Sequence, residues 1–156
     1  MNKIIDIDEV PELVNKLRKD NKKIVFTNGC FDILHVGHTS LLEKASEYGD
    51  VLIVGVNSDK SVKSIKGKGR PIQCEIDRTK LLSAISYVSY VVVFGDDTPE
   101  ELVKMIAPDV LVKGGDYKKD DIVGSQYAKI VVTVKYIPGK STTIIEKNLR
   151  KSNKPR

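Results

Sequence analysis

The stretch Lys23–His38, KIVFTNGCFDILHVGH, decides the fold of this chain. It begins with a run rich in Val and Ile that predicts a strand, turns at a glycine, and enters a helix that Gly37 opens. Four more apolar runs follow, separated by stretches with helical spacing. They lie at 51–57, 90–94, 110–113 and 130–137. Because nearly continuous apolar strands alternate with helices, we predict an α/β fold with a mainly parallel, doubly wound, five-stranded sheet and helices on both faces.

The helical stretches and the charge pattern set the domain boundaries. Helices are predicted at 8–19, 37–48, 58–65, 75–85, 98–106 and 142–149. With 40% hydrophobic residues in 156, the chain can form one domain with its own core. We assign residues 1–150 to that domain, with an N-terminal helical segment at 1–21 and a catalytic core at 22–149. Residues 151–156 lack any apolar side chain and are predicted to form a disordered basic tail.

The composition excludes several classes of protein. The last ten residues contain five cations and no acid, and the rest of the chain carries equal numbers of basic and acidic residues, so the net charge of +5 does not indicate a nucleic-acid-binding face. A nucleic-acid-binding role would depend on the tail alone. The two cysteines form no disulfide framework, the N-terminus lacks a signal peptide's apolar stretch, and no apolar run approaches ~18 residues. We expect a cytoplasmic protein without a membrane segment.

The turn after the first strand carries the chemistry. In a doubly wound sheet, ligands bind beyond the carboxyl ends of the strands at the switch point. Gly29 lets a ligand approach the backbone there, and the helix that begins at Gly37 presents free amide groups that favour an anion. The only two histidines, His35 and His38, flank that helix start, which indicates a phosphate site. The alternative is a metal site formed by Cys30, Asp32, His35 and His38, although no second cluster of Cys or His completes a tetrahedral set of ligands.

Four later parts of the chain are candidates for the same end of the sheet. Lys60–Arg70 contains five cations and no acid, and we predict a mobile loop that closes over a triphosphate, although a solvated charged loop is the alternative. Arg78 lies early in a helix, where an ion pair with Glu75 is its simplest role. The segment 113–117 directly follows a strand. Thr143 and Glu146 together predict a capping box on the last helix.

These blocks resemble a known family. GCFDILHVGH is similar to the HxGH signature of the cytidylyltransferase-like nucleotidyltransferases, and further blocks match at 56–59, 66–72, 77–78, 111–117 and 141–143. The resemblance covers about residues 22–149. It is strongest to the branch that transfers AMP from ATP to D-glycero-β-D-manno-heptose 1-phosphate. It implies a Rossmann-like fold, a homodimer, and ATP and a sugar phosphate as substrates.

The resemblance also implies roles for single residues. His35 and His38 are expected to contact the triphosphate, with Lys66 and Arg78 on the β- and γ-phosphates and the leaving group. Three groups of residues are expected to line the nucleotide site. The first group follows the first strand and comprises Thr27, Asn28, Gly29, Phe31 and Gly37. The second group, near the base and ribose, comprises Lys113, Gly114 and Asp116, and the third group, at the start of the last helix, comprises Ser141, Thr142 and Thr143. Mg²⁺ would arrive with the triphosphate, and no protein metal site is expected.

Other functions remain open from the sequence. A sibling transferase would keep the phosphate-binding residues and use CTP with glycerol 3-phosphate, or ATP with flavin mononucleotide. A nucleotide sensor without turnover is a candidate of another class. The simultaneous presence of His35, His38, Lys66 and Arg78 disfavours the sensor, because binding alone does not need all four residues.

Overall fold

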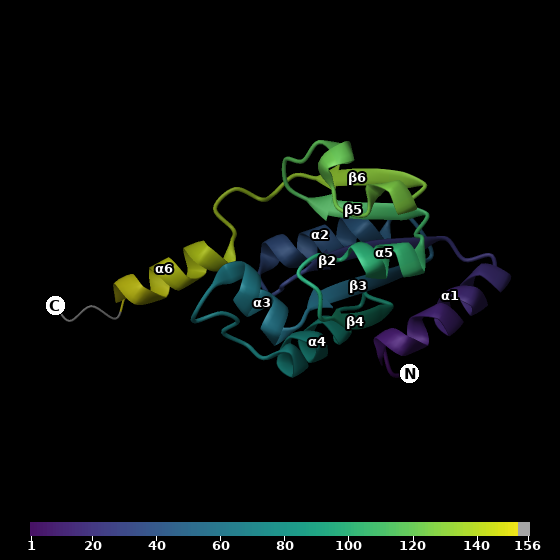
Figure 1. Ribbon diagram of the computed structural model, residues 1–156. Helices are drawn as coiled ribbons and strands as arrows, with labels where there is room; N and C mark the ends of the chain where they lie inside the picture. The colour runs from purple at the N-terminus through teal and green to yellow at the C-terminus, as the bar shows by residue number, and fades with distance from the viewer. Residues whose placement is uncertain (153–156) are drawn as a thin grey trace.

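The computed structural model describes residues 1–152 and has three layers, a parallel sheet between two layers of helices (Figure 1). The described strands are β1 (Ile4–Ile5), β2 (Ile24–Gly29), β3 (Val51–Asn57), β4 (Tyr90–Phe94), β5 (Val110–Gly114) and β6 (Ile130–Val134). The helices are α1 (Val10–Lys19), α2 (Val36–Ser46), α3 (Asp59–Lys66), α4 (Glu75–Ser83), α5 (Glu100–Ile106) and α6 (Thr142–Ser152). Short 3-10 turns lie at Ile7–Glu9, Lys119–Asp121 and Ser125–Tyr127.

The described sheet has six strands in the order β1-β4-β3-β2-β5-β6, and every neighbouring pair is parallel. The doubly wound α/β prediction is confirmed, but the prediction of five strands was wrong. The additional strand, β1, pairs Ile4 with Val91 and Ile5 with Val92. A strand of two residues is too short to show a periodic pattern, so its formation depends on the exposed edge of β4.

Alternating side chains of the strands divide the core into two halves. Phe26 of β2 packs with helices α1 and α5 on one face. Val25, its neighbour, packs with α2 and α4 on the other face. Both side chains are fully buried. The strands therefore carry apolar residues at nearly every position, as the sequence pattern predicts for a sheet that helices cover on both sides.

The switch point of the sheet lies between β2 and β5, where the chain reverses its direction of winding. These strands pair only at Val25 with Val110 and at Phe26 with Leu111. Beyond those pairs, β2 continues alongside β3, and β5 continues alongside β6. The carboxyl ends of β2 and β5 therefore separate, and a crevice opens between them, at the place where this kind of fold binds ligands.

Some boundaries differ from the sequence-based expectation. The helix predicted at 58–65 is confirmed as α3, because the Ser58 side chain caps it and Val62 is buried. The overlapping prediction of a mobile loop at 60–70 was therefore wrong for residues 60–66. Helix α6 continues through Lys151 and Ser152, which we had assigned to the tail. The remaining tail residues lie outside the described residues. Within residues 1–152, no helix combines the length and apolarity that a bilayer span requires.

Candidate active site

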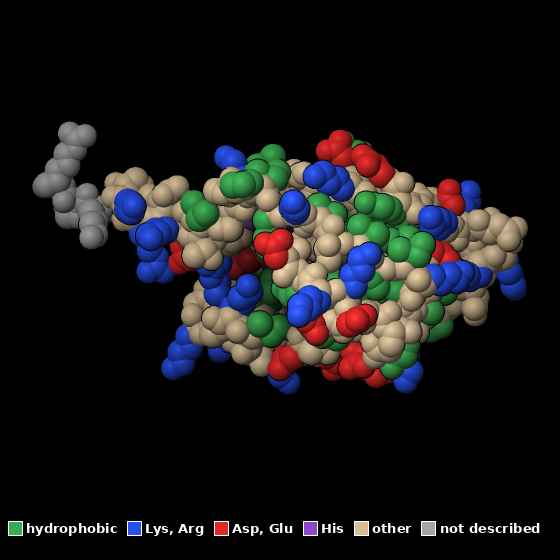
Figure 2. Space-filling model, turned by 90° about the horizontal axis from the view of Figure 1, so that it is seen from above, with side chains coloured by type: hydrophobic (Ala, Val, Ile, Leu, Met, Phe, Trp, Pro, Cys, Tyr) green, Lys and Arg blue, Asp and Glu red, His purple; other side chains and the backbone are tan. Residues whose placement is uncertain are grey.

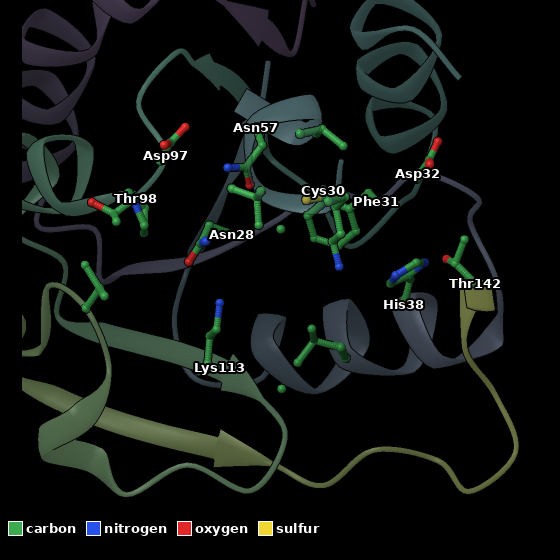
Figure 3. Close-up of a pocket in the computed structure, with 18 of the residues that line it drawn as sticks. Asn28, Cys30, Phe31, Asp32, His38, Asn57, Asp97, Thr98, Lys113 and Thr142 are labelled. Carbon is green, nitrogen blue, oxygen red and sulfur yellow. The ribbon is translucent and has the colours of Figure 1, made fainter. Parts of the chain in front are cut away.

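A cavity of about 670 Å³ opens at the crevice between β2 and β5 (Figure 3). Its walls come from the end of β2, the start of α2, the end of α3, the end of β5 and the start of α6. An adjoining cavity of about 440 Å³ lies between α2 and the segment that connects β6 to α6. In the space-filling view, both basic and acidic side chains lie around the hollow near the end of the molecule that carries α6 (Figure 2). Two lysines, Lys66 and Lys113, line the main cavity and can bind an anionic ligand.

The two histidines lie together at the start of α2. The His35 ring caps the helix, since its Nδ1 accepts a hydrogen bond from the Gly37 amide at 3.0 Å. The rings of His35 and His38 stack with centroids 3.8 Å apart, and Phe31 packs edge-on against His38. A Cβ at Gly37 would lie 2.8 Å from the His35 ring, so this close approach requires glycine.

Burial favours the neutral form of both histidine side chains. Burial lowers the pKa of His35. Burial and the neighbouring His35 lower the pKa of His38 to about 4, although the Ile33 carbonyl opposes this shift. The His38 Nδ1 atom is buried and has no hydrogen-bond partner among residues 1–152. Neutral imidazoles can donate N–H groups to phosphate oxygens, and a bound anion would raise both pKa values.

Asp32 and Arg70 connect three segments around the cavity. The Asp32 carboxylate accepts hydrogen bonds from the Ile72 and Gln73 amides and from Arg70 Nη1 at 3.0 Å. The Arg70 guanidinium also pairs with Glu146 of α6. Burial alone would raise the pKa of Asp32, but the two amides and the guanidinium lower it overall. No local pattern indicates this connection, because its partners are far apart along the chain.

The metal alternative receives no structural support. Asp32, one of its four proposed ligands, already binds two amides and the Arg70 guanidinium. No group of three or more His, Cys, Asp and Glu side chains within the described part of the chain could hold a metal ion.

Arg78 occupies a position that differs from its expected role at the leaving group. Its side chain is fully buried and does not line either cavity. Its N–H groups donate to the carbonyl oxygens of Gln73, Cys30 and Asn57 and to the Asp59 carboxylate. The expected surface pair with Glu75 is also absent, since Glu75 accepts from the Asp59 amide. Arg78 therefore joins the ends of β2 and β3 to the segment before α4.

Most of the other expected residues do line the cavities. The main cavity is lined by Asn28, Gly29, Phe31, His38, Lys66, Lys113, Gly114, Thr142 and Thr143. The adjoining cavity adds His35, Gly37 and Ser141. Thr27 and Asp116 line neither cavity. Thr27 is fully buried because alternation along β2 directs it away from Asn28, and Asp116 is exposed beyond the Gly114–Gly115 turn.

The start of α6 differs in detail from the prediction. Ser141 caps the helix by accepting a hydrogen bond from the Ile144 amide, and Thr142 donates to the Ile33 carbonyl. The predicted capping box of Thr143 and Glu146 was wrong, because Glu146 pairs with arginines instead. The Thr142–Ile33 bond places the first amide groups of α6 beside the turn that leads into α2.

Several lining residues were not predicted as site residues. Asn57 ends β3 and donates to the Ser61 hydroxyl, and Asp97 and Thr98 follow β4. Tyr136 lines the cavity near β6, and so does Tyr117, which ends the segment 113–117 that was expected at this end of the sheet. Their position just after strand ends was the available clue, because all carboxyl ends of a parallel sheet meet at one edge.

Comparison with known proteins agrees with this geometry. The family model described as Cytidylyltransferase-like matches residues 26–153. The chain belongs to this family. The predicted family is therefore confirmed, and with it the class of enzyme, a nucleotidyltransferase.

The relatives extend the family assignment. The chain is 55% identical over 147 residues to "Bifunctional protein HldE" from Nitratiruptor sp., which covers 94% of this chain and 32% of that protein. It is 52% identical over 143 residues to the protein of the same name from Helicobacter pylori, covering 91% and 31%. The chain thus spans about a third of the length of these curated relatives.

Two solved structures are similar to the structure of this chain. One is a lipopolysaccharide core biosynthesis protein from Thermoplasma volcanium, with a TM-score of 0.64, 28% identity, and coverage of 74% of this chain and 98% of that one. The other is a pantoate-beta-alanine ligase from Francisella tularensis, with a TM-score of 0.64, 19% identity, and coverage of 95% and 73%. The second likeness concerns the fold alone.

Proposed function

We propose that this nucleotidyltransferase transfers AMP from ATP to D-glycero-β-D-manno-heptose 1-phosphate, giving ADP-heptose and pyrophosphate. The observation that carries the proposal is the pair of stacked, neutral histidines at the start of α2, which shares a cavity with Lys66 and with the start of α6. The heptose acceptor is supported by the resemblance of the sequence blocks. It is also supported by the similarity to a protein of lipopolysaccharide core biosynthesis.

The reaction requires positioning and charge stabilisation. An oxygen of the sugar phosphate attacks the α-phosphorus of ATP in line, the bond to the bridging oxygen breaks, and pyrophosphate leaves. Since the attacking oxygen is already ionised, no general base or covalent intermediate is required. Mg²⁺ belongs to the substrate, because the triphosphate and water supply its ligands.

Each group in the cavity has a corresponding task. The N–H groups of His35 and His38 would stabilise charge that grows at the α-phosphate. Lys66 and the first amides of α6 would hold the other phosphates and the leaving group. Arg78, which we first expected at the leaving group, instead keeps the ends of β2 and β3 in place.

The test is pyrophosphate release across the four nucleoside triphosphates and a panel of phosphate monoesters, with the product identified by mass. We expect turnover with ATP and heptose 1-phosphate, dependent on Mg²⁺ and lost in EDTA. Preference for CTP with glycerol 3-phosphate, or for flavin mononucleotide, would reassign the chain to a sibling activity. Nucleotide binding without turnover for any pair would indicate a sensor.

We also propose that the enzyme works in the cytoplasm as a homodimer and does not bind nucleic acid. The family resemblance supports the homodimer, and light scattering on the purified protein tests it. A monomeric mass at micromolar concentration would contradict the dimer. Salt-dependent retention of labelled DNA would contradict the absence of nucleic-acid binding.

A further inference from the structure

The two cavities meet at the groups that bind phosphate. Both are lined by His38, Lys66 and Thr142. We call the adjoining cavity, between α2 and the segment 134–144, the loop lobe. We call the part of the main cavity around Asn28 and Lys113 the switch lobe. A reaction between two phosphates needs both reactants to meet at one point, so one substrate in each lobe would bring their phosphates together at the junction.

Lys113 belongs to the switch lobe and not to the loop lobe. It comes from the end of β5, and its side chain extends into the cavity toward the end of β2 that carries Asn28 (Figure 3). The crevice exists there because pairing between β2 and β5 stops at Leu111, two residues earlier. The position of this ammonium group is therefore a direct consequence of the switch point.

The ammonium group of Lys113 lacks an anionic partner. Within residues 1–152 its Nζ forms no ion pair or hydrogen bond, and it lies over the Tyr117 ring, 5.9 Å from the ring centroid. Burial lowers the pKa of Lys113, and the charge of Lys66 lowers it further, while the Cys30 thiolate would oppose both effects. A half-buried cation without a partner is costly, and a bound anion would remove that cost.

We propose that Lys113 binds the phosphate monoester of the acceptor and holds it in the switch lobe for attack on the α-phosphate. This inference rests on the proposed transferase activity. It replaces our expectation that Lys113 contacts the base and ribose. The triphosphate does not need Lys113, because Lys66 and the starts of α2 and α6 already surround the junction. The acceptor phosphate carries two negative charges and needs a cation of its own.

The test compares Lys113→Met and Lys113→Arg with the wild type in steady-state kinetics. Each substrate is varied in turn while the other is saturating, and Lys118→Met, an exposed lysine of the following turn that lines neither cavity, is the matched control. We expect Lys113→Met to lower kcat/KM for the acceptor by about 10- to 100-fold, the range for a hydrogen bond to a charged group. The KM for ATP should change less than threefold, Lys113→Arg should retain most of the acceptor affinity, and Lys118→Met should match the wild type.

Two results would overturn the inference. An increase in the KM for ATP as large as that for the acceptor would assign Lys113 to the nucleotide. Wild-type constants for both substrates in Lys113→Met would show that the ammonium contacts neither. Thermal unfolding of each variant, followed by circular dichroism, separates these results from a loss of folded protein.

A second measurement separates this inference from the proposed function. Calorimetry measures how the wild type and Lys113→Met bind each phosphate monoester of the panel in the presence of a non-hydrolysable ATP analogue. If the wild type rejects heptose 1-phosphate but binds another monoester, the proposed function fails, while weaker binding of that monoester by Lys113→Met supports the inference. Equal binding by both proteins, or binding of no monoester by the wild type, contradicts it.

Discussion

Replacement of Arg78 by methionine should destabilise the fold, although the family resemblance implies a catalytic role for this residue. The side chain is fully buried, and its N–H groups satisfy three backbone carbonyls, those of Gln73, Cys30 and Asn57. It also pairs with Asp59 at 2.8 Å. Methionine fills a similar volume but donates no hydrogen bond, so the variant isolates the loss of these contacts.

The magnitude follows from the groups that lose their partner. A buried polar atom left without a hydrogen bond costs about 1–3 kcal/mol, and part of this cost is relieved where water reaches the carbonyl oxygen. The Asp59 carboxylate is 41% exposed, so its loss of a partner adds little. Since three carbonyl oxygens lose their donor and water relieves part of the cost, we expect the free energy of unfolding to fall by about 3–5 kcal/mol.

The assay is urea unfolding of the wild type, Arg78→Met and Lys80→Met. Lys80 is exposed on the same helix, and its replacement should change the free energy of unfolding by less than about 0.5 kcal/mol. Turnover is measured at a temperature where each variant is folded. If Arg78→Met kept the stability of the wild type yet lost about 100-fold in turnover, the structural role of Arg78 would be refuted. Direct contact of Arg78 with the leaving group would then be favoured.

Three further predictions concern the phosphate site and the opposite end of the sheet. His38→Ala should lower kcat at least ~100-fold with an unchanged melting temperature, since one preorganised donor is lost; near-normal turnover would remove His38 from the mechanism. Lys66→Ala should reduce kcat/KM for ATP more than Lys63→Ala, because Lys66 lines both cavities and Lys63 lines neither. Equal losses would indicate that these lysines act only through their overall positive charge. Asp109→Asn should destabilise the protein by up to about 2 kcal/mol at pH 7 in urea unfolding. Burial would raise the pKa of Asp109, but hydrogen bonds from Lys129, the Ile24 amide and Arg18 lower it to about 2. The difference in unfolding free energy between the wild type and Asp109→Asn should therefore shrink as the pH falls from about 4 to 2. A difference that stays constant over this range would contradict the prediction.

The sequence by itself determined the class of fold and the place of the site. Strands that are apolar at nearly every position must be buried on both faces, and the helices that alternate with them along the chain cover both faces of a parallel sheet. The GCFDILHVGH turn fixes its own geometry locally, because the His35 ring caps the helix that it precedes and glycine at 37 leaves room for that ring. The histidines and the start of α6 could be predicted together, since they lie where helices begin after strand ends. Lys66 ends α3, so its place in the site was predicted from the family resemblance of the block at 66–72.

The tertiary structure decided which polar groups meet. The two-residue strand β1 exists only because β4 offers it an edge. Arg78 reaches the Cys30 carbonyl, and Arg70 reaches Asp32 and Glu146, across large separations in sequence. No local pattern specifies such pairs, because an arginine next to a phosphate and an arginine bound to backbone carbonyls can have identical neighbours in the chain. Only the packed arrangement of β2, β3 and the segment before α4 shows that the N–H groups of Arg78 are already occupied, while the ammonium of Lys113 faces an open crevice.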